Sequence, residues 1–397
     1  MGEESKKQNT LIVHNYYQIP GGEDTVVANE KRMLEEHGHK VILYTRNNAE
    51  LKRMSKLRKF FLPATTVFNP KSYKEIKQLI QKENIEVVHV HNTLNLISPA
   101  VYYAAKAMKV PVVQTIHNFR LLCPGATFYR DGHICEDCVE HGLKCAVKHS
   151  CYRESTAQTL VCVLSTWFHR MTGIYGKISY ICLTDFNRNK LLELKQVKSD
   201  KVFVKPNFVE SIGKYIPEDQ RKNQFIFVGR LDKLKGIDTL FSAWEKMGER
   251  APKLIVCGTG PMEEWCKKFL TNRKVNIEMK GLVSNIEARK LIAISRALIL
   301  PTRWYEGFPM SIVEAFSVGT PVLCSALGNA GAVVENGITG YKFNAESVDE
   351  LIQSANMCYG LCEKTYGIYQ KRYTKEENYN KLMEIYNAKR KNIRKMF

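Results

Sequence analysis

The sequence predicts an α/β protein of two domains, each with a parallel sheet covered by helices. Three observations support this prediction. The chain has 397 residues, more than one hydrophobic core usually organises. Short runs of β-branched and apolar residues alternate with segments of helical periodicity, which is the pattern of repeated strand–helix–strand units. The alternation restarts after a polar stretch that contains two prolines, Pro206–Asn223, where we place the link between the domains.

The first half of the chain contains five apolar runs of strand length. They lie at Leu11–His14, Val41–Thr45, Val87–Val90, Val112–Ile116 and Ile178–Leu183. Between the first two runs, apolar residues recur at helical spacing over Thr25–His37, just after the glycine pair Gly21-Gly22. We therefore expect a strand, a glycine-rich turn and a helix at the start of the chain.

The second half repeats the same order of elements. Strands are predicted at Phe225–Val228, Leu254–Cys257, Ala297–Leu300 and Val322–Cys324. Helices are predicted at Ile237–Met247 and Pro309–Val318. Proline at the first position of the second helix and Gly319 just after its last position are the usual start and stop signals.

The composition is that of a globular protein, with 44% hydrophobic and 25% charged residues. No apolar run reaches the roughly 18 residues of a membrane-spanning helix. The N-terminus is polar and has no signal-peptide core, so we expect a cytoplasmic protein. The net charge of +19 favours acidic partners. Because the basic residues are dispersed over both halves rather than interleaved with aromatics on one patch, we expect no nucleic acid.

One segment concentrates positive charge beside aromatic residues. Leu51–Val67 contains five cations and no acid in its first ten residues, followed by Phe60 and Phe61. This pattern is typical of a peripheral contact with an anionic membrane, and a solvated charged helix is the alternative. We expect association with the inner face of the cell membrane.

Charged residues in the second half follow the predicted strand ends. Gly229-Arg230 comes directly after one strand, and Lys235-Gly236 precedes the next helix. Two cations and a helix N-terminus form a plausible site for a diphosphate. Further on, Glu306 and Glu314 stand eight positions apart, and Gly307-Phe308-Pro309-Met310 directly follow Glu306. A carboxylate accepts hydrogen bonds from neighbouring hydroxyls on two oxygens, so the pair suits a sugar and a ribose.

These motifs together resemble glycosyltransferase family 4, including bacterial polysaccharide and capsule glycosyltransferases. The resemblance is carried by Gly229-Arg230 with Lys235-Gly236, by GTGP at 258–261, by KGLVSN at 280–285, by EGFPMSIVEA at 306–315 and by GTPVL at 319–323. In the first half, Gly21-Gly22 and the strand that ends in His117 are similar to the family's glycine turn and histidine strand. The resemblance implies the GT-B fold, two Rossmann-like domains facing each other across a cleft.

The resemblance also implies a function and a site. The function is that of a retaining, metal-independent hexosyltransferase that moves a sugar from a UDP- or GDP-sugar to a glycan or polyprenyl-linked acceptor in surface polysaccharide synthesis. The implied catalytic residues are His117, Arg230, Lys235 and Glu306. The implied donor-binding residues are Gly22, Arg230, Lys235, Gly260, Leu282, Glu306, Gly307, Phe308, Pro309, Met310 and Glu314. Glu23 and Asp24, directly after the glycines, are expected to contact the acceptor.

The expected chemistry follows from these residues. Negative charge develops on the departing diphosphate, so fixed cations such as Arg230 and Lys235 stabilise the transition state most. No carboxylate pair like that of a retaining glycosidase can be assigned. We therefore expect attack on the face from which the phosphate leaves, with that phosphate taking the acceptor proton and His117 acting as a positioning group. No cofactor is expected for catalysis.

A cysteine-rich insertion at 123–151 contains five of the twelve cysteines. The Cys135-Glu-Asp-Cys138 spacing is that of a metal knuckle, and Cys123 and Cys151 complete four thiolates for a structural zinc ion. A loop of reduced cysteines and a redox pair are the alternatives. Cys145 and His149 are spare ligand candidates.

The expected domain boundaries follow from these elements. Residues 1–207 form an acceptor-side domain with the cysteine-rich insertion, 208–367 form the nucleotide-sugar-binding domain, and 368–397 form a helix that returns to the first domain. Two other functions share part of the pattern. A nucleotide-sugar epimerase of the same fold would need acid and base carboxylates beside the sugar, which cannot be assigned. A non-catalytic protein that binds sugar nucleotides or nucleic acid is the other alternative, but such a sugar-nucleotide sensor would normally have lost one of Arg230, Lys235 and Glu306, and all three are present.

Overall fold

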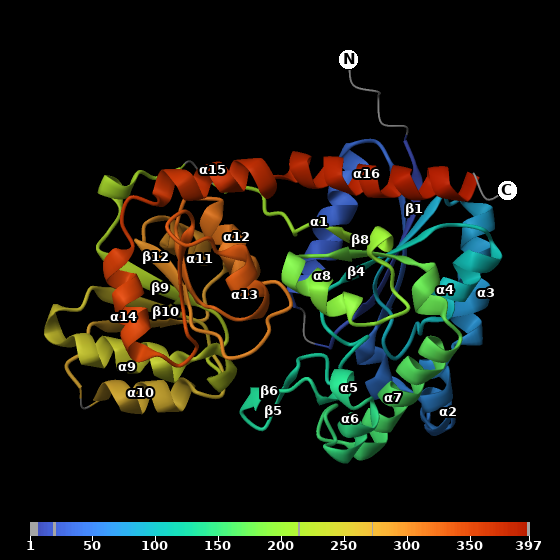
Figure 1. Cartoon of the computed structure of the whole chain (residues 1–397), viewed down its shortest axis with the longest axis horizontal. Coiled ribbons are helices and arrows are strands. Elements are labelled where there is room, and N and C mark those ends of the chain that lie inside the picture. The colour runs from blue at the N-terminus through green and yellow to red at the C-terminus, as the bar shows by residue number, and fades with distance from the viewer. Residues whose placement is uncertain (1–6, 19–20, 213–214, 272, 395–397) are drawn as a thin grey trace. The chain divides into compact units, whose positions relative to one another are not determined.

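The computed structural model describes residues 7–18, 21–212, 215–271 and 273–394, with the side chains of 389–394 left aside. The chain divides into two compact units (Figure 1). Unit 1 comprises Met1–Arg130, Cys135–Pro206 and Asn378–Phe397, and unit 2 comprises Asp131–Ile134 and Asn207–Glu377. Unit 2 thus extends ten residues beyond the predicted boundary at 367, and a short piece of the cysteine-rich insertion groups with it.

Unit 1 is built on a parallel sheet of six strands in the order β2-β1-β3-β4-β7-β8. The strands are β1 (Asn9–Tyr16), β2 (Lys40–Asn47), β3 (Val87–Asn92), β4 (Val112–Ile116), β7 (Ser179–Cys182) and β8 (Val202–Val204). The middle strands β3 and β7 are buried along their whole length, as expected for a sheet with helices on both faces. A separate hairpin of β5 (Tyr129–Arg130) and β6 (His133–Ile134) lies in the cysteine-rich insertion.

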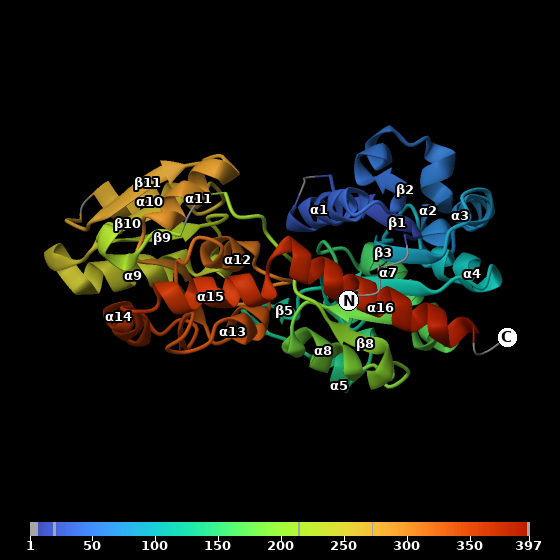
Figure 2. The same ribbon diagram turned by 90° about the horizontal axis from the view of Figure 1, so that it is seen from above.

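The helices of unit 1 connect these strands and cover the sheet (Figures 1 and 2). They are α1 (Gly22–Glu36), α2 (Lys56–Val67), α3 (Pro70–Lys82), α4 (Ala100–Ala107), α5 (Asp137–Glu140), α6 (Lys144–Lys148), α7 (Thr156–Met171) and α8 (Asp185–Leu192). Helix α1 begins three residues earlier than predicted, because Asp24 at its third position accepts a hydrogen bond from the backbone amide of Gly21 and so caps the first turn. The stretch that precedes α2 forms a 3₁₀ helix over Asn48–Arg53.

Unit 2 is a second parallel sheet of six strands, in the order β11-β10-β9-β12-β13-β14. Its strands are β9 (Gln224–Val228), β10 (Lys253–Cys257), β11 (Ile277–Gly281), β12 (Ala297–Leu300), β13 (Val322–Ser325) and β14 (Gly340–Phe343). Counted along the chain, this is the 3-2-1-4-5-6 order of a Rossmann fold. Two apolar clusters, one on each face of the sheet, form the core.

The helices of unit 2 are α9 (Ile237–Met247), α10 (Glu263–Thr271), α11 (Asn285–Ala293), α12 (Met310–Phe316), α13 (Gly328–Val333), α14 (Val348–Met357) and α15 (Cys362–Arg372). Helix α12 is shorter than predicted, and Pro309 stands at its N-cap rather than inside the first turn. The last helix, α16 (Lys375–Arg394), contributes its residues from Asn378 onward to unit 1. There Tyr379 stacks on His37 and hydrogen-bonds His39.

The predicted fold class is confirmed: each unit is a Rossmann-like domain of the GT-B type. In each sheet the strand order reverses at one point, between β1 and β3 in unit 1 and between β9 and β12 in unit 2. Loops that follow the two strands on either side of such a point diverge and leave a crevice where ligands bind. Ligand sites are therefore expected at the ends of β1 and β3 in unit 1 and of β9 and β12 in unit 2. None of the described helices has the length and apolar composition needed to cross a membrane.

Candidate functional site

In unit 2, the residues after β9 and β12 meet at the reversal point of the sheet. Lys235 follows β9, Glu306 follows β12, and the Lys235 Nζ lies 2.6 Å from the Glu306 Oε1. The loop that carries Lys235 can approach β12 because Gly236 ends it with a positive φ of 66°. A Cβ at that glycine would stand 1.9 Å from the carbonyl oxygen of Pro301, so only glycine fits.

Glu306 is held by three side-chain donors. Its Oε1 also accepts from the Thr302 hydroxyl at 3.0 Å and from the Trp304 indole nitrogen at 3.1 Å. The side chain is buried, with 8% of its surface exposed. Among the described residues, all of these contacts go to Oε1 and leave Oε2 without a hydrogen bond. This arrangement fixes the carboxylate and keeps one oxygen available for a ligand hydroxyl.

The loop after Glu306 is anchored from α13. The Asn329 side-chain amide donates to the backbone carbonyls of Glu306 and Gly307, both at 2.6 Å. Phe308 and Met310 pack partly buried against the apolar core. Pro309 caps α12 and Glu314 lies on that helix, where it accepts a hydrogen bond from Asn285 at 2.8 Å.

The other predicted residues of unit 2 lie further apart. The Arg230 side chain is 67% exposed and forms a 3.6 Å ion pair with Asp232. Gly260 is required by packing, since a Cβ there would stand 2.4 Å from the carbonyl oxygen of Leu231. Leu282 is 81% exposed and follows Gly281, whose φ is positive. The structure thus joins Lys235 and Glu306 directly, whereas Arg230 and Leu282 extend into solvent.

In unit 1, polar residues gather at the carboxyl ends of β1, β3 and β4. His14 lies on β1 and His91 on β3, and His117 follows β4. The His91 Nδ1 lies 2.9 Å from the His117 Nε2. His117 and His91 line a polar cavity of about 70 Å³ together with Asn92, Gln114 and other residues of this unit. Burial, reinforced by the neighbouring His91, holds the pKa of His117 well below its usual value, so the ring is neutral.

The two predicted acceptor residues stand at the start of α1. Both oxygens of Asp24 are engaged, Oδ1 by His14 at 2.8 Å and Oδ2 by the backbone amide of Gly21 at 3.0 Å. Glu23 accepts a hydrogen bond from the Tyr17 hydroxyl at 3.1 Å. Burial raises the pKa of Glu23 to about 8, so this carboxyl is largely protonated at neutral pH. Gly22 is the exposed first residue of the helix.

Sequence reasoning did not single out several residues of these sites. They are Thr302, Trp304 and Asn329 in unit 2, and Tyr17, Glu30, His14, His91 and Lys205 in unit 1. Two signals were present in the sequence. Thr302 and Trp304 stand between the end of β12 and Glu306. The alternation of His89 and His91 on β3 places both side chains on one face of a strand at the reversal point.

The cysteine-rich insertion brings the thiols near one another. Burial, and to a smaller extent the neighbouring Cys123, Cys151 and Cys145, raise the pKa of the Cys138 thiol to about 12. In the described part of the chain, the possible metal ligands whose donor atoms all lie within 4.8 Å of one another are Glu30, His89 and His91. The cysteines of the insertion do not form such a group among the described residues. The four predicted thiol ligands would therefore have to draw closer to surround a zinc ion.

Two family patterns cover most of the chain. Residues 20–211 match the family described as Glycosyltransferase Family 4, and residues 209–357 match Glycosyl transferases group 1. A Methanocaldococcus jannaschii protein named as an uncharacterized glycosyltransferase is 34% identical over 152 residues, which is 36% of this chain and 37% of that protein. The chain thus matches little more than a third of this relative.

Two further comparisons extend over much longer stretches. The Escherichia coli UDP-Gal:alpha-D-GlcNAc-diphosphoundecaprenol alpha-1,3-galactosyltransferase is 23% identical and covers 75% of this chain and 74% of its own length. The crystal structure of Anabaena HepE in complex with UDP superposes with a TM-score of 0.65 at 15% identity. That alignment covers 96% of this chain and all of HepE, so the two proteins share their fold.

Proposed function

We propose that this chain, which belongs to glycosyltransferase family 4, transfers a hexose from a UDP- or GDP-sugar to a glycan or polyprenyl-linked acceptor in surface polysaccharide synthesis. The observation that carries the proposal is the Lys235–Glu306 pair at the reversal point of the unit 2 sheet. It combines a fixed cation with a carboxylate that has one free oxygen, which suits a diphosphate joined to a sugar.

In the proposed donor complex, Lys235 and Arg230 bind the diphosphate. Lys235 is 22% exposed and is held by Glu306, so it is preorganised, whereas the exposed Arg230 closes onto the phosphates when the donor binds. Glu306 Oε2 accepts from hydroxyls of the sugar, and Glu314 accepts from the ribose. The UDP bound by HepE, whose fold this chain shares, supports a nucleotide-sugar donor.

The transfer proceeds with retention and without a metal ion. The bond between the anomeric carbon and the phosphate oxygen breaks, and the acceptor hydroxyl attacks on the same face. The departing phosphate takes the hydroxyl proton, so no separate base is needed. Lys235 and Arg230 neutralise the charge that develops on the phosphate, the task that a divalent ion performs in other enzymes. Glu306 is tied to three donors on one oxygen and serves as a binding group rather than a nucleophile.

The acceptor side of the reaction is assigned to unit 1. His117 is a neutral ring beside a polar cavity and suits a hydrogen bond with a sugar hydroxyl. Glu23, protonated at neutral pH, can donate to an acceptor oxygen. Asp24 has both oxygens engaged within unit 1, so we assign it the role of holding His14 and the glycine turn. The name of the E. coli relative includes a diphosphoundecaprenol acceptor, which supports a lipid-linked acceptor here.

A surface of unit 1 fits the membrane contact that a lipid-linked acceptor requires. Helix α2 exposes Phe60 to 76% and Leu57 to 69%, and α7, which packs against it, exposes Trp167 to 52% and Met171 to 70%. Next to them, an apolar groove of about 670 Å³ lies between α6 and α7, and its lining includes Lys144, Lys148 and Arg170. Apolar side chains beside cations match the acyl and phosphate layers of an anionic bilayer.

Co-sedimentation with vesicles tests the membrane contact. The wild-type chain is expected to bind vesicles that contain phosphatidylglycerol and not those of phosphatidylcholine alone. The variant F60S/W167S should lose most of this binding, while L43S, which replaces another exposed leucine on β2, should keep it. Equal binding by all three proteins would exclude this surface as the membrane contact.

The donor assignment is tested by a thermal-shift panel of UDP-, GDP- and ADP-sugars, followed by donor turnover with and without lipid-linked acceptors. One nucleotide class should raise the melting temperature, and Lys235→Met should abolish the shift. Turnover that depends on an acceptor supports a transferase. Conversion of the donor into its epimer without any acceptor would instead establish the epimerase.

A further inference from the structure

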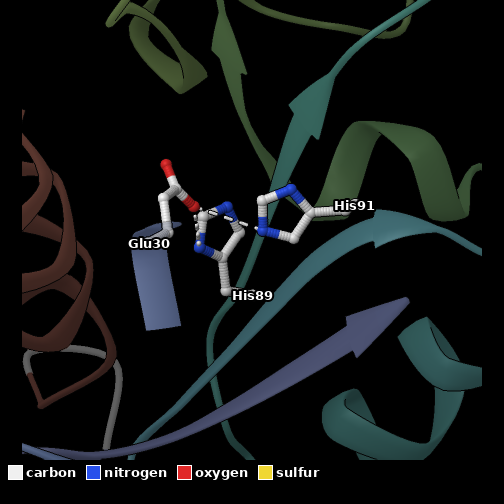
Figure 3. A group of neighbouring side chains, drawn as sticks. All are labelled: Glu30, His89 and His91. Atoms are coloured by element: carbon white, nitrogen blue, oxygen red, sulfur yellow. Dashed lines mark ion pairs between the residues drawn. The ribbon is translucent and has the colours of Figure 1, made fainter. Parts of the chain in front are cut away.

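A group of charged and polar residues lies buried behind His117 in unit 1. Glu30 comes from α1, His89 and His91 from β3, and Lys205 from the segment after β8. The four side chains are almost completely inaccessible. Figure 3 shows Glu30 facing both imidazoles. The Glu30 Oε2 lies 3.2 Å from the His91 Nε2 and 3.6 Å from the His89 Nδ1, and the Lys205 Nζ donates to the Glu30 Oε1 at 2.6 Å.

The donor atoms of Glu30, His89 and His91 are close enough to surround a metal ion, but their other partners disfavour one. Both nitrogens of His89 already have partners, the Tyr386 hydroxyl and the Thr115 hydroxyl, each at 2.8 Å. A divalent ion would displace Tyr386 and would stand next to the ammonium group of Lys205. The cluster is therefore better described as a self-contained ionic network.

The charges of this network are fixed by its surroundings. Burial alone would raise the pKa of Glu30, but Lys205 and the two histidines hold it well below its usual range. Burial lowers the pKa of His89 to about 3. The network therefore pairs the Lys205 side chain with an ionised Glu30 carboxylate, and the His89 ring is neutral at neutral pH.

An ionised carboxylate determines which nitrogen of His91 carries the proton. The Glu30 Oε2 lies 3.2 Å from the His91 Nε2, and neither atom has a hydrogen-bond partner among the described residues. When the His91 ring carries a single proton, that proton lies on Nε2, facing the carboxylate, because a bare nitrogen there would oppose negative charge with a lone pair. The His91 Nδ1 is then an acceptor, so the His117 Nε2, 2.9 Å away, must donate to it.

We propose that Glu30 is a positioning residue which, through His91, fixes His117 in the neutral form protonated on Nε2. The Nδ1 of His117 is then always a hydrogen-bond acceptor, ready for a hydroxyl of the sugar substrate. The role of this hydroxyl contact in catalysis rests on the function proposed above, but the fixed form of the ring does not. Without Glu30, the proton on each of the two rings, His91 and His117, could move from Nε2 to Nδ1. In part of the molecules, His117 would then present its Nδ1–H group as a donor to the same hydroxyl.

The test uses two double variants, because E30Q alone would leave the buried ammonium of Lys205 without a counter-ion. E30M/K205M removes both charges and the acceptor for His91. E30Q/K205M removes both charges but keeps an acceptor oxygen at position 30. E35Q serves as the control, because Glu35 lies on the same helix with an exposed side chain paired with Lys31. Circular dichroism and urea unfolding verify that each variant is folded.

The protonated nitrogen of His117 is read directly by nitrogen-15 NMR of the full chain. We expect Nε2 protonation in the wild type, E35Q and E30Q/K205M, and a mixture of the two neutral forms in E30M/K205M. Protonation of His117 on Nδ1 in the wild type would overturn the proposal. So would an unchanged form in a folded E30M/K205M.

Steady-state rates give the second readout. E30M/K205M should lose about 10- to 100-fold in kcat with an unchanged KM for the donor, by analogy with the loss of groups that orient metal-binding histidines. E30Q/K205M should recover most of this loss, which a purely structural role would not produce. A wild-type chain that turns over no nucleotide-sugar would contradict the proposed function and leave the NMR result intact. A fully active H117A would refute the hydroxyl contact alone.

Discussion

The substitution Glu306→Gln isolates the charge of the residue on which the donor site depends. A glutamine can keep its carbonyl oxygen in the place of Oε1 and continue to accept from Thr302 and Trp304. It removes the counter-charge of Lys235 and replaces the free Oε2 by an NH₂ group. The change is therefore nearly neutral in shape but converts an acceptor of sugar hydroxyls into a donor.

The expected magnitudes follow from these contacts. The 2.6 Å contact between Lys235 and Glu306 is a charge-assisted hydrogen bond, and such bonds contribute about 1.5–3 kcal/mol when buried. Because Lys235 is 22% exposed and keeps some hydration, we expect a loss of about 1–2 kcal/mol in the free energy of unfolding. Natural domains have about 5–15 kcal/mol, so the variant should remain folded.

The effect on catalysis should be larger than the effect on stability. In this variant Lys235 loses the partner that fixes its position, and the sugar hydroxyls meet a donor instead of an acceptor. Both changes lie where the transition state carries charge. Removing one such contact typically lowers the rate by about 10²–10³, or about 2.7–4 kcal/mol. We therefore expect kcat/KM for the donor to fall at least about 100-fold, measured as the initial rate of nucleoside diphosphate release at saturating acceptor.

The matched control is Glu278→Gln. Glu278 lies on β11 of the same unit and forms exposed ion pairs with Lys253 and Lys280. This variant also removes a carboxylate from a lysine pair, but away from the reversal point of the sheet, and should keep wild-type activity. The reasoning is refuted if E306Q, verified as folded by urea unfolding, stays within a few-fold of the rate of E278Q.

Three further predictions concern packing, pH and metal. Gly236→Ala should destabilise unit 2 and abolish donor binding, measured by urea unfolding and thermal shift, because its Cβ would overlap the Pro301 carbonyl; Gly132→Ala, which has a similar φ but open space around it, should cost far less. His89 has a folded-state pKa of about 3, below its unfolded value, so its contribution to stability is present above about pH 6.5 and is lost as the pH falls towards 3; the urea midpoint should drop over this window and drop less in H89Q. A zinc ion held by the four thiols remains a prediction, with one zinc per chain expected by elemental analysis and none in C138S; zinc well below one per wild-type chain would exclude it.

The sequence was sufficient for the middle of each large sheet but missed three of the four edge strands. Strands buried on both sides, such as β9 and β12, were predicted within a residue or two because their runs are continuously apolar. In the two large sheets, the three strands that were missed, β8, β11 and β14, all lie at a sheet edge. An edge strand has one neighbour and is partly exposed, so polar residues such as Glu278 and Lys280 are tolerated on β11 and conceal its periodicity.

The same physical difference separates the two candidate sites. In unit 2 the candidate side chains Lys235 and Glu306 lie in the loops that follow β9 and β12, so these loops could be identified from the order of strands and turns. The predicted convergence of Arg230 and Lys235 on a diphosphate stays a prediction, because Arg230 is exposed and the position of an exposed side chain depends on its ligand. Local sequence thus identifies the loops, and tertiary contacts decide which side chains in them meet.

In unit 1 the decisive contacts join residues that are far apart in the chain. Lys205 pairs with Glu30 across 175 positions, and Tyr386 reaches His89 across 297 positions. Apart from the alternation of His89 and His91 on β3, such a network has no local signature, because each other member is by itself an ordinary polar residue. Moreover, Asn378 accepts from Lys205 at 2.8 Å, so α16 supplies two of the partners that satisfy the buried charges. A buried ion without its full set of partners is costly, and the histidine cluster therefore depends on the last helix of the chain for its stability as well as on the strands that carry it.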